Sequence, residues 1–133
     1  MREYLQFYIN GEWVDPVKPN SHDVINPATE EVCAHISLGS EEDVDRAVAA
    51  ARAAFETWGY SSREERIAVL ESCVATYEKY YNDMADAIRE EMGAPRSLAV
   101  GGQAHAGLGH LKEALRVLRD FSFEEDLGEH RVF

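Results

Sequence analysis

Apolar and polar residues follow a helical period over much of this chain, most clearly between residues 40 and 58. Apolar side chains recur there at spacings of three and four, which places them on one face of a helix. This apolar stripe comprises Val44, Ala47, Val48, Ala51, Phe55 and Trp58. Ser40 is a suitable N-cap, and Asp43, three residues later, can complete a capping box. The pattern therefore predicts an amphipathic helix that begins after Ser40.

The residues before this helix have the pattern of short β-strands. Asn10-Gly11 lies between two short apolar runs, and this pair favours the type I′ turn of a β-hairpin. A further short strand is predicted at residues 22–25, ahead of Asn26-Pro27. Strict alternation over residues 32–38 predicts a half-buried strand. Its apolar face carries Val32, Ala34, Ile36 and Leu38, and its polar, outward face carries Cys33, His35 and Ser37.

Two helices are predicted after the break at Gly59. Ser62 and Glu65 have the spacing of a second capping box. The apolar stripe of this helix comprises Ile67, Leu70, Val74, Tyr77 and Tyr81. Asn82 is expected to cap the next, shorter helix, which Gly93 ends. The residues expected to face inward on that helix are Met84, Ile88 and Met92.

A fourth helix is predicted from about residue 96 to residue 121. The residues that share its apolar face are Ala104, Leu108, Leu111, Leu115, Leu118 and Phe121. Its first half contains four glycines, each of which costs about 1 kcal/mol relative to alanine in a helix. We therefore expect this half either to pack very closely against a neighbour or to fray.

The order of elements predicts an α+β chain, in which a β-hairpin and short strands are followed by about four helices. We divide residues 1–133 into a β-segment (4–38), a helical segment (40–121) and a tail (122–133). The tail is acidic, becomes β-like at its last residues, and ends without a turn or cap, as though the chain were cut. A chain of 133 residues is long enough for one domain with a core.

The formal net charge of −12 disfavours nucleic acid and anionic membranes as partners. No apolar run approaches the roughly 18 residues of a membrane span, and the first residues lack the apolar core of a signal peptide. Two cysteines, Cys33 and Cys73, do not make a disulfide scaffold. These features together predict a cytoplasmic protein with free thiols.

Candidate catalytic and metal-binding residues are few. Cys33 and His35 project from the same strand face, so they form either a nucleophile–base pair, as in a Cys–His hydrolase, or part of an ordinary polar face. No two histidines have the i, i+4 spacing of a helical two-histidine metal site, and there is no C-x-x-C motif. The histidines are His22, His35, His105, His110 and His130.

Two further segments invite a functional interpretation. The glycine-rich segment 101–110 could suggest a phosphate loop, but no strand precedes it and no Gly-Lys-Ser/Thr follows. Close helix packing explains it better. Glu90 and Glu91 end the third helix and could act as an acid–base pair, although adjacent carboxylates are commonly solvated surface residues. The residues therefore contain no complete catalytic constellation.

Several segments, in this order, resemble the opening of an aldehyde dehydrogenase. They are Phe7-Tyr8-Ile9-Asn10-Gly11-Glu12-Trp13, Val24-Ile25-Asn26-Pro27-Ala28-Thr29-Glu30-Glu31-Val32, residues 38–55 with Trp58, residues 63–70, and Glu90-Glu91-Met92-Gly93-Ala94-Pro95. The resemblance covers about residues 6–121. It identifies the chain as similar to the amino-terminal portion of the dinucleotide-binding domain of an NAD(P)-dependent aldehyde dehydrogenase, with a partial α/β fold.

This resemblance implies the chemistry of the full-length family. A cysteine thiolate attacks an aldehyde, a hydride passes to NAD or NADP, and a glutamate activates water to release the carboxylic acid. The residues that do this, and those that bind the cofactor, are expected beyond Phe133. Cys33 and Cys73 do not match the nucleophile motif. We therefore expect no catalytic or cofactor-binding residue in this chain, and no cofactor bound to it alone.

One minor site is also implied by the resemblance. Some family members hold a structural cation near the Asn-Pro turn and the end of the third helix. The backbone carbonyl of Val24 or Ile25 and the carboxylate of Glu91 would supply oxygen ligands of the kind that hard cations prefer. The simpler alternative is an exposed, hydrated glutamate.

The expected partners follow from the uncovered helix faces. If the chain is a dehydrogenase segment, its apolar stripes should bind the remainder of that fold or self-associate, and an isolated copy should expose a large apolar patch. The alternative is a non-enzymatic helical interaction module that keeps the scaffold without the chemistry.

Overall fold

A computed structural model describes residues 2–128 and 130–132 of this chain. The strands of the described part are β1 (Arg2–Tyr4), β2 (Phe7–Ile9), β3 (Glu12–Val14), β4 (Ser21–Asn26), β5 (Glu31–Ser37), β6 (Glu125–Leu127) and β7 (His130–Val132). The helices are α1 (Glu41–Trp58), α2 (Arg63–Lys79), α3 (Tyr81–Met92), α4 (Arg96–Leu98) and α5 (Ala104–Asp120), with a π-helical segment η1 (Ala99–Gln103). The predicted α+β class and element order are confirmed.

The strand predicted from alternation, β5, is the centre of a three-stranded sheet with the order β1-β5-β4. β4 pairs with it antiparallel, with an irregularity between Val24 and Ile25. The predicted division into two faces is only partly confirmed: Ala34 is buried, but Val32 and Ile36 are half-buried like Cys33, His35 and Ser37 on the other face. Leu38 follows β5 and is 42% exposed, so its predicted inward position was wrong. β1 pairs parallel to β5 and was not predicted from the sequence. Arg2–Tyr4 has no alternating pattern, so this pairing is decided by tertiary contacts.

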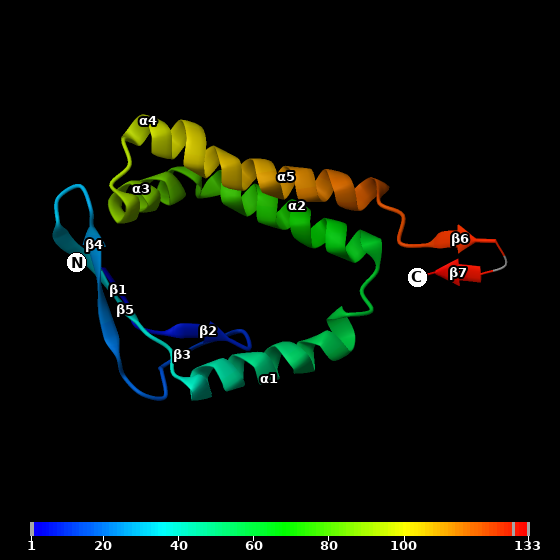
Figure 1. The fold of residues 1–133 in the computed structure, drawn as a ribbon, viewed down its shortest axis with the longest axis horizontal. Helices are drawn as coiled ribbons and strands as arrows, with labels where there is room; N and C mark the ends of the chain where they lie inside the picture. The colour runs from blue at the N-terminus through cyan, green and yellow to red at the C-terminus, as the bar shows by residue number, and fades with distance from the viewer. Residues whose placement is uncertain (1, 129, 133) are drawn as a thin grey trace.

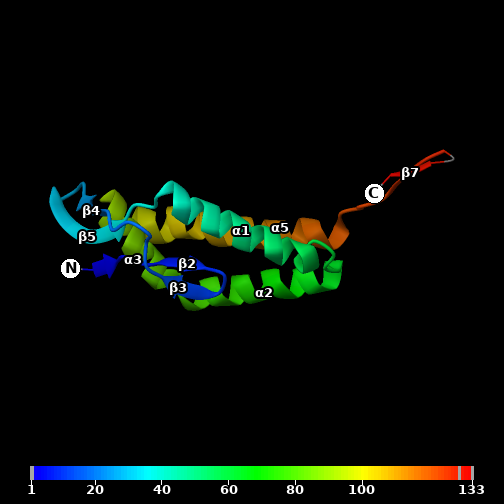
Figure 2. The ribbon, with the colours of Figure 1, turned by 90° about the horizontal axis from the view of Figure 1, so that it is seen from below.

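The β2–β3 hairpin has the predicted turn. Asn10 and Gly11 both have positive φ, at 54° and 82°, as a type I′ turn requires. On one face of the hairpin, the rings of Tyr8 and Trp13 pack with their centroids 5.3 Å apart. The hairpin lies alongside α1 (Figures 1 and 2).

Both predicted capping boxes are present. The carboxylate of Asp43 accepts a hydrogen bond from the Ser40 backbone N–H at 2.9 Å. Its other oxygen accepts the backbone N–H of Val17 at 3.0 Å. Asp43 is therefore only 4% exposed. These bonds join the start of α1 to the loop between β3 and β4.

The α2–α5 pair forms the main helix–helix contact of the described part of the chain. The two helices lie side by side (Figure 1), with Leu115 buried between the layers. Where α3 meets η1 and the start of α5, the buried residues are the small side chains Ala85, Ala99 and Ala104. The predicted stripe of α2 is half-buried throughout. The helical core therefore relies on close approach of backbones rather than on large side chains.

The predicted fourth helix is interrupted by a π-helical segment. Residues 96–120 are helical, but η1 occupies Ala99–Gln103. Tyr81 donates its hydroxyl to the Val100 carbonyl at 2.6 Å, and Tyr77 donates to the Ala104 carbonyl at 2.9 Å. Two tyrosines of the preceding helices thus hold the irregular turn in place.

Two predictions about α3 were wrong. Its N-cap is Tyr80, with no side-chain capping bond, and Asn82 lies inside the helix. Met84 and Met92 do not face inward, since they are 42% and 58% exposed. Ala85 takes the buried position instead, because its small side chain allows α3 to approach its neighbours closely. The end at Gly93 is as predicted, with a left-handed φ of 66°.

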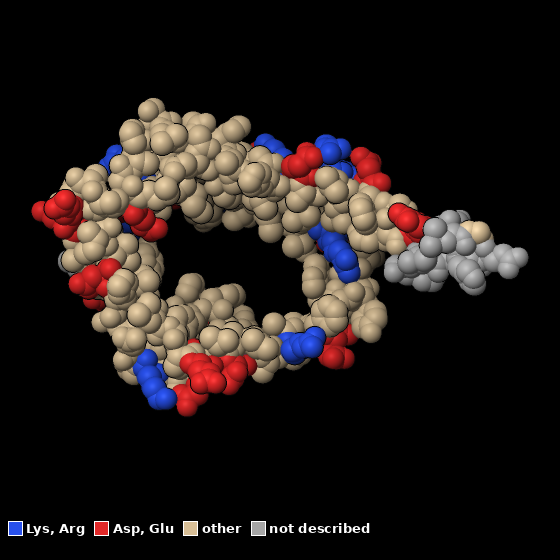
Figure 3. Space-filling model, in the orientation of Figure 1, with Lys and Arg blue, Asp and Glu red and all other residues tan. Residues whose placement is uncertain are grey.

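An opening separates α1 from the α2–α5 pair. Figure 1 shows α1 and the β2–β3 hairpin on one side, α2 and α5 on the other, and the three-stranded sheet at one end. The opening persists in the space-filling view, where most of the side chains around its rim are uncharged (Figure 3). The β6–β7 hairpin extends away from the rest of the chain in both ribbon views (Figures 1 and 2). None of the helices in the described part is both long and apolar enough to span a membrane.

Candidate functional site

Cys33 and His35 lie on neighbouring positions of β5, but they do not form a pair. The thiol of Cys33 donates to the Val24 carbonyl at 3.3 Å. The Nδ1 atom of His35 lies 2.8 Å from an Asp23 carboxylate oxygen on β4. Each candidate catalytic side chain therefore has a partner on the adjacent strand rather than the other candidate. A nucleophile needs its base within hydrogen-bond reach, and this arrangement does not supply one.

The remaining histidines give no metal site in the described part of the chain. No group of three or more His, Cys, Asp or Glu side chains among those residues could hold a metal ion. The side chain of His130 lies outside the described residues. His35 is engaged with Asp23, and His105 and His110 are exposed on α5. Cys33 and Cys73 are both free thiols.

The glycine-rich segment 101–110 is helical, and only part of it packs closely. A Cβ atom built at Gly107 would lie 2.5 Å from the hydroxyl oxygen of Tyr77, so this glycine permits the contact between α2 and α5. Gly101 and Gly109 have no atom within 4 Å of such a Cβ. Close packing therefore explains Gly107, while the other two positions leave open faces on the helix.

The elements that carry the residues of the predicted cation site, β4 and α3, are in contact. Gly93, at the end of α3, packs against the turn after β4, where an added Cβ would lie 2.9 Å from the Ala28 nitrogen. This contact brings the Glu91 end of α3 next to the Ile25 end of β4. The Val24 carbonyl already accepts the Cys33 thiol. Glu90, beside Glu91, forms an ion pair with Arg2, so it is not the simple solvated carboxylate that we considered.

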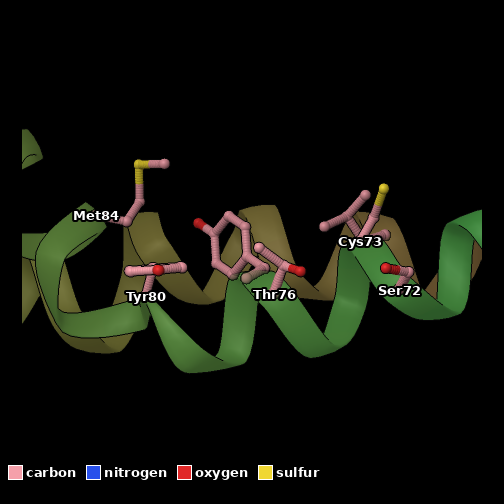
Figure 4. Close-up of a pocket in the computed structure, with 7 residues that line it drawn as sticks. Ser72, Cys73, Thr76, Tyr80 and Met84 are labelled. Carbon is pink, nitrogen blue, oxygen red and sulfur yellow. The ribbon is translucent and has the colours of Figure 1, made fainter.

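The structure also has a groove that the sequence did not indicate. It has a volume of about 400 Å³ and is lined mainly by apolar surface of α2, α3 and α5. Its lining residues are Ser72, Cys73, Thr76, Tyr77, Tyr80, Met84 and Leu111. The side chains of Cys73 and Met84 project from the helices on its rim (Figure 4). Cys73 and Met84 are exposed here, so the described part of the chain leaves this apolar groove uncovered.

The apolar stripe predicted between residues 44 and 58 lies on α1, and this α1 stripe is uncovered in the described part of the chain. Val44, Val48, Phe55 and Trp58 are 58%, 55%, 59% and 49% exposed. The hairpin lies beside one end of α1, where Phe7, Ile9, Val44 and Ala47 line a hollow of about 430 Å³ between the two elements. The exposed apolar patch that we expected for an isolated copy is therefore present.

Known proteins resemble this chain in sequence. The model of the aldehyde dehydrogenase family matches residues 13–129. The chain belongs to the aldehyde dehydrogenase family. It is 50% identical, over 133 residues, to a 3-succinoylsemialdehyde-pyridine dehydrogenase of a Pseudomonas species. It is 44% identical, over 132 residues, to an aldehyde dehydrogenase homologue of Staphylococcus epidermidis. Each match covers 99% of this chain but only 28% of the relative.

Solved structures of the family contain the same fold. A Bartonella henselae aldehyde dehydrogenase matches 97% of this chain and 27% of its own, with a TM-score of 0.94 and 45% identity. Aldehyde dehydrogenase C of Pseudomonas syringae matches with a TM-score of 0.89 and 43% identity, over 92% of this chain and 25% of its own. That enzyme was crystallised with NAD+ and octanal. This aldehyde dehydrogenase chain therefore spans about a quarter of the length of its relatives.

Proposed function

We propose that this chain is the amino-terminal scaffold segment of a dehydrogenase that oxidises an aldehyde to a carboxylic acid with NAD or NADP. The observation that supports this most directly is coverage: 99% of the chain matches only 28% of a dehydrogenase relative. The segment belongs to the dinucleotide-binding domain in this proposal. Its two free cysteines support a reducing compartment, and we propose the cytoplasm.

The chain alone should not catalyse the reaction or bind the cofactor. The reaction needs a thiolate nucleophile with an activating partner and donors for an oxyanion. Cys33 bonds a backbone carbonyl, and His35 bonds Asp23. In this proposal the nucleophile, the glutamate that activates water and the residues that hold NAD(P) come from the remaining length of the enzyme.

The partner of the α1 stripe is, in this proposal, the remainder of the same dehydrogenase. The opening between α1 and the α2–α5 pair is lined mostly by uncharged side chains (Figure 3). Exposed apolar surface of this extent is favourable to bury, at roughly 25 cal/mol per Å². In the relatives, about three quarters of the chain is additional to the part matched here. In this proposal, the additional polypeptide of the full-length enzyme fills the opening.

Turnover and mass test the proposed function. Purified residues 1–133 should give no NADH from an aldehyde and NAD+, whereas the full reading frame should give a clear rate. Robust turnover by residues 1–133 alone would contradict the proposal. The intact mass of the natural protein adds a second criterion, since a mass well above 15.0 kDa indicates a longer enzyme.

Thiol labelling tests the docking surface separately. In a background with Cys33 and Cys73 replaced by serine, Val48→Cys places a thiol on the α1 stripe, and Ala53→Cys places one on the opposite face. Both should react in residues 1–133 alone. In the full-length protein only Val48→Cys should become protected. Equal reactivity of both thiols in the full-length protein would show that the remainder does not cover the stripe.

A non-enzymatic interaction module is the second candidate function, and the exposed α1 stripe is the observation that favours it. In that case the natural protein would have the 15.0 kDa mass of this chain, and the stripe would bind a different protein. Sedimentation of the natural protein distinguishes the two, because the module would be short and the dehydrogenase long.

We also propose that the Ile25 carbonyl and the Glu91 carboxylate contribute to a structural cation site. The packing of Gly93 supports this, because it brings the end of α3 against the turn that follows β4. Raising Na+ against choline at constant ionic strength should stabilise the full-length protein. Glu91→Gln should remove that increase in Tm, whereas Glu64→Gln on α2 should retain it. Loss of the increase in both variants, or no increase at all, would contradict the site.

A further inference from the structure

A polar cavity lies where β1, the end of β4, α3 and α4 meet. Its volume is about 580 Å³, and it is separate from the apolar groove beside Cys73. The residues that line it are Arg2, Asn26, Asp86, Arg89, Glu90 and Arg96. They come from β1, β4 and the neighbouring helices α3 and α4, so three parts of the chain that are far apart in the sequence meet here. Glu91, which the proposed cation site uses, does not line this cavity.

Positive charge is concentrated in this cavity. Three of its six lining residues are arginines, although the chain as a whole has a net charge of −12. Arg2 is neutralised by its ion pair with Glu90. The side chains of Arg89, Arg96 and Asp86 have no hydrogen-bond or ion-pair partner among residues 2–128 and 130–132. Two unpaired guanidinium groups therefore line the same cavity as one unpaired carboxylate.

The neutral residue of the cavity also offers donors. The side-chain oxygen of Asn26 accepts the backbone N–H of Ala28 at 2.9 Å. With its oxygen engaged, the side-chain NH2 of Asn26 is left to donate. A guanidinium group carries five N–H donors in a planar fork that matches the oxygens of carboxylates and phosphates. The available groups, apart from Asp86, are thus all hydrogen-bond donors.

We propose that this cavity binds a small oxyanion, a phosphate or a carboxylate, through Arg89, Arg96 and the amide of Asn26. Asp86 opposes the anion by charge repulsion and limits the affinity. Arg89 and Arg96 are exposed, so solvent screens the interaction. Dissociation constants on the order of 1 mM are expected. This site does not depend on the dehydrogenase activity.

The experiment uses the full-length protein that carries this segment, with inorganic phosphate and acetate as separate probes. Each is titrated against chloride at constant ionic strength, and binding is followed by NMR. Saturable binding of phosphate, of acetate or of both supports the site and identifies which oxyanion it accepts. No saturable binding of either anion up to about 50 mM would overturn the proposal.

Substitutions locate the binding. Arg89→Ala and Arg96→Ala should each weaken binding by roughly fivefold or more. Asp86→Asn should strengthen it by roughly threefold, because it removes the opposing charge. Arg52→Ala, which removes an exposed arginine of α1, is the matched control and should leave binding unchanged. If Arg52→Ala weakens binding as much as Arg89→Ala, the effect is one of net charge and the proposed site is wrong.

A more conservative variant keeps the test valid if Arg89→Ala fails to fold. Arg89→Lys keeps the positive charge and loses the planar fork, so it should fold even if Arg89→Ala does not. Its affinity should fall between those of the native protein and a variant without the charge. Unchanged affinity in Arg89→Lys and Asp86→Asn together would overturn the assignment of the anion to this cavity.

Discussion

α5 and α1 have similar amphipathic sequence patterns but very different surroundings. α2 and α5 place their apolar stripes against each other and bury Leu115. α1 has an equally regular stripe, yet Val48 and Phe55 are more than half exposed. The comparison teaches that an amphipathic pattern indicates a face that must be covered. It does not indicate whether the covering element lies in the same segment.

The connection between the two regions explains why α1 does not fold back onto α2. The residues between α1 and α2 form a tight turn, in which Arg66 donates to the Gly59 carbonyl at 3.1 Å and to the Ser61 hydroxyl at 2.9 Å. At this same end of α2, its first residue, Arg63, donates to the Arg119 carbonyl of α5 and to the carbonyl of Phe121, which follows α5. The start of α2 is thus bonded both to the turn and to the end of α5, and α1 has the hairpin as its main neighbour.

The largest expected effect comes from truncating one apolar side chain in each region. In residues 1–133, Leu115→Ala should lower the free energy of unfolding by about 3 kcal/mol, because it leaves a cavity between packed helices. Val48→Ala should cost only about 0.5 kcal/mol there, because Val48 is already exposed. Chemical denaturation measures both. Equal losses would show that the α1 stripe is covered within this segment.

Glycine substitutions test how closely α2 and α5 approach. Gly107→Ala should destabilise residues 1–133 by about 1–2 kcal/mol, because the new Cβ would collide with the Tyr77 hydroxyl. Gly109→Ala, on the same helix with open space, should stabilise by up to about 1 kcal/mol through its higher helix propensity. Denaturation of the two variants side by side gives the comparison. A gain in both would mean that the helices are further apart than described.

The smallest effect concerns how α1 is attached at its start. Asp43→Ala should lower Tm by roughly 5 °C, because it removes the capping box and the bond to Val17. Glu65→Ala, in the capping box of α2, should have a smaller effect because Glu65 bonds no distant segment. Thermal unfolding measures both, and a larger effect of Glu65→Ala would contradict this role of Asp43.

Acid titration sharpens the same comparison. Hydrogen bonds from the Ser40 and Val17 backbones hold the pKa of Asp43 below its usual value. A lowered folded-state pKa gives a stabilisation that is complete above the unfolded value of about 3.9. It is lost as pH falls through the folded pKa. Asp43→Ala should therefore lose less stability than the native chain as pH falls below about 4. An identical loss in both would show that Asp43 is not titrating in this range.

Local signals predicted the parts of the fold that depend on neighbours in sequence. Asn10-Gly11 specified the hairpin turn, Ser40 and Ser62 specified two helix starts, and Gly93 specified a helix end. Asn82 was misassigned because the short turn at Tyr80 lets α3 follow α2 almost directly, so no side-chain cap forms. β1 and the π-helical segment were missed because each depends on a distant partner, β5 for the strand and Tyr81 for the π-turn.

For the candidate sites too, local sequence predicted which residues share an element, and tertiary contacts decided their partners. Sequence spacing placed Cys33 and His35 on one strand face, but register with β4 gave each a different partner. The arginine cavity left no local signal, because its residues are separated by up to 94 positions between Arg2 and Arg96. Only the meeting of β1 with α3 brings them together.

By itself the sequence determined the class of elements, most of their ends, the net negative charge and the resemblance to aldehyde dehydrogenases. Periodicity and capping depend on residues within a few positions of one another, so both can be recognised in the sequence alone. The tertiary structure alone decided that α2 and α5 cover each other while α1 remains bare, and that three arginines share a cavity. Those outcomes depend on how distant segments approach, which no short-range pattern specifies.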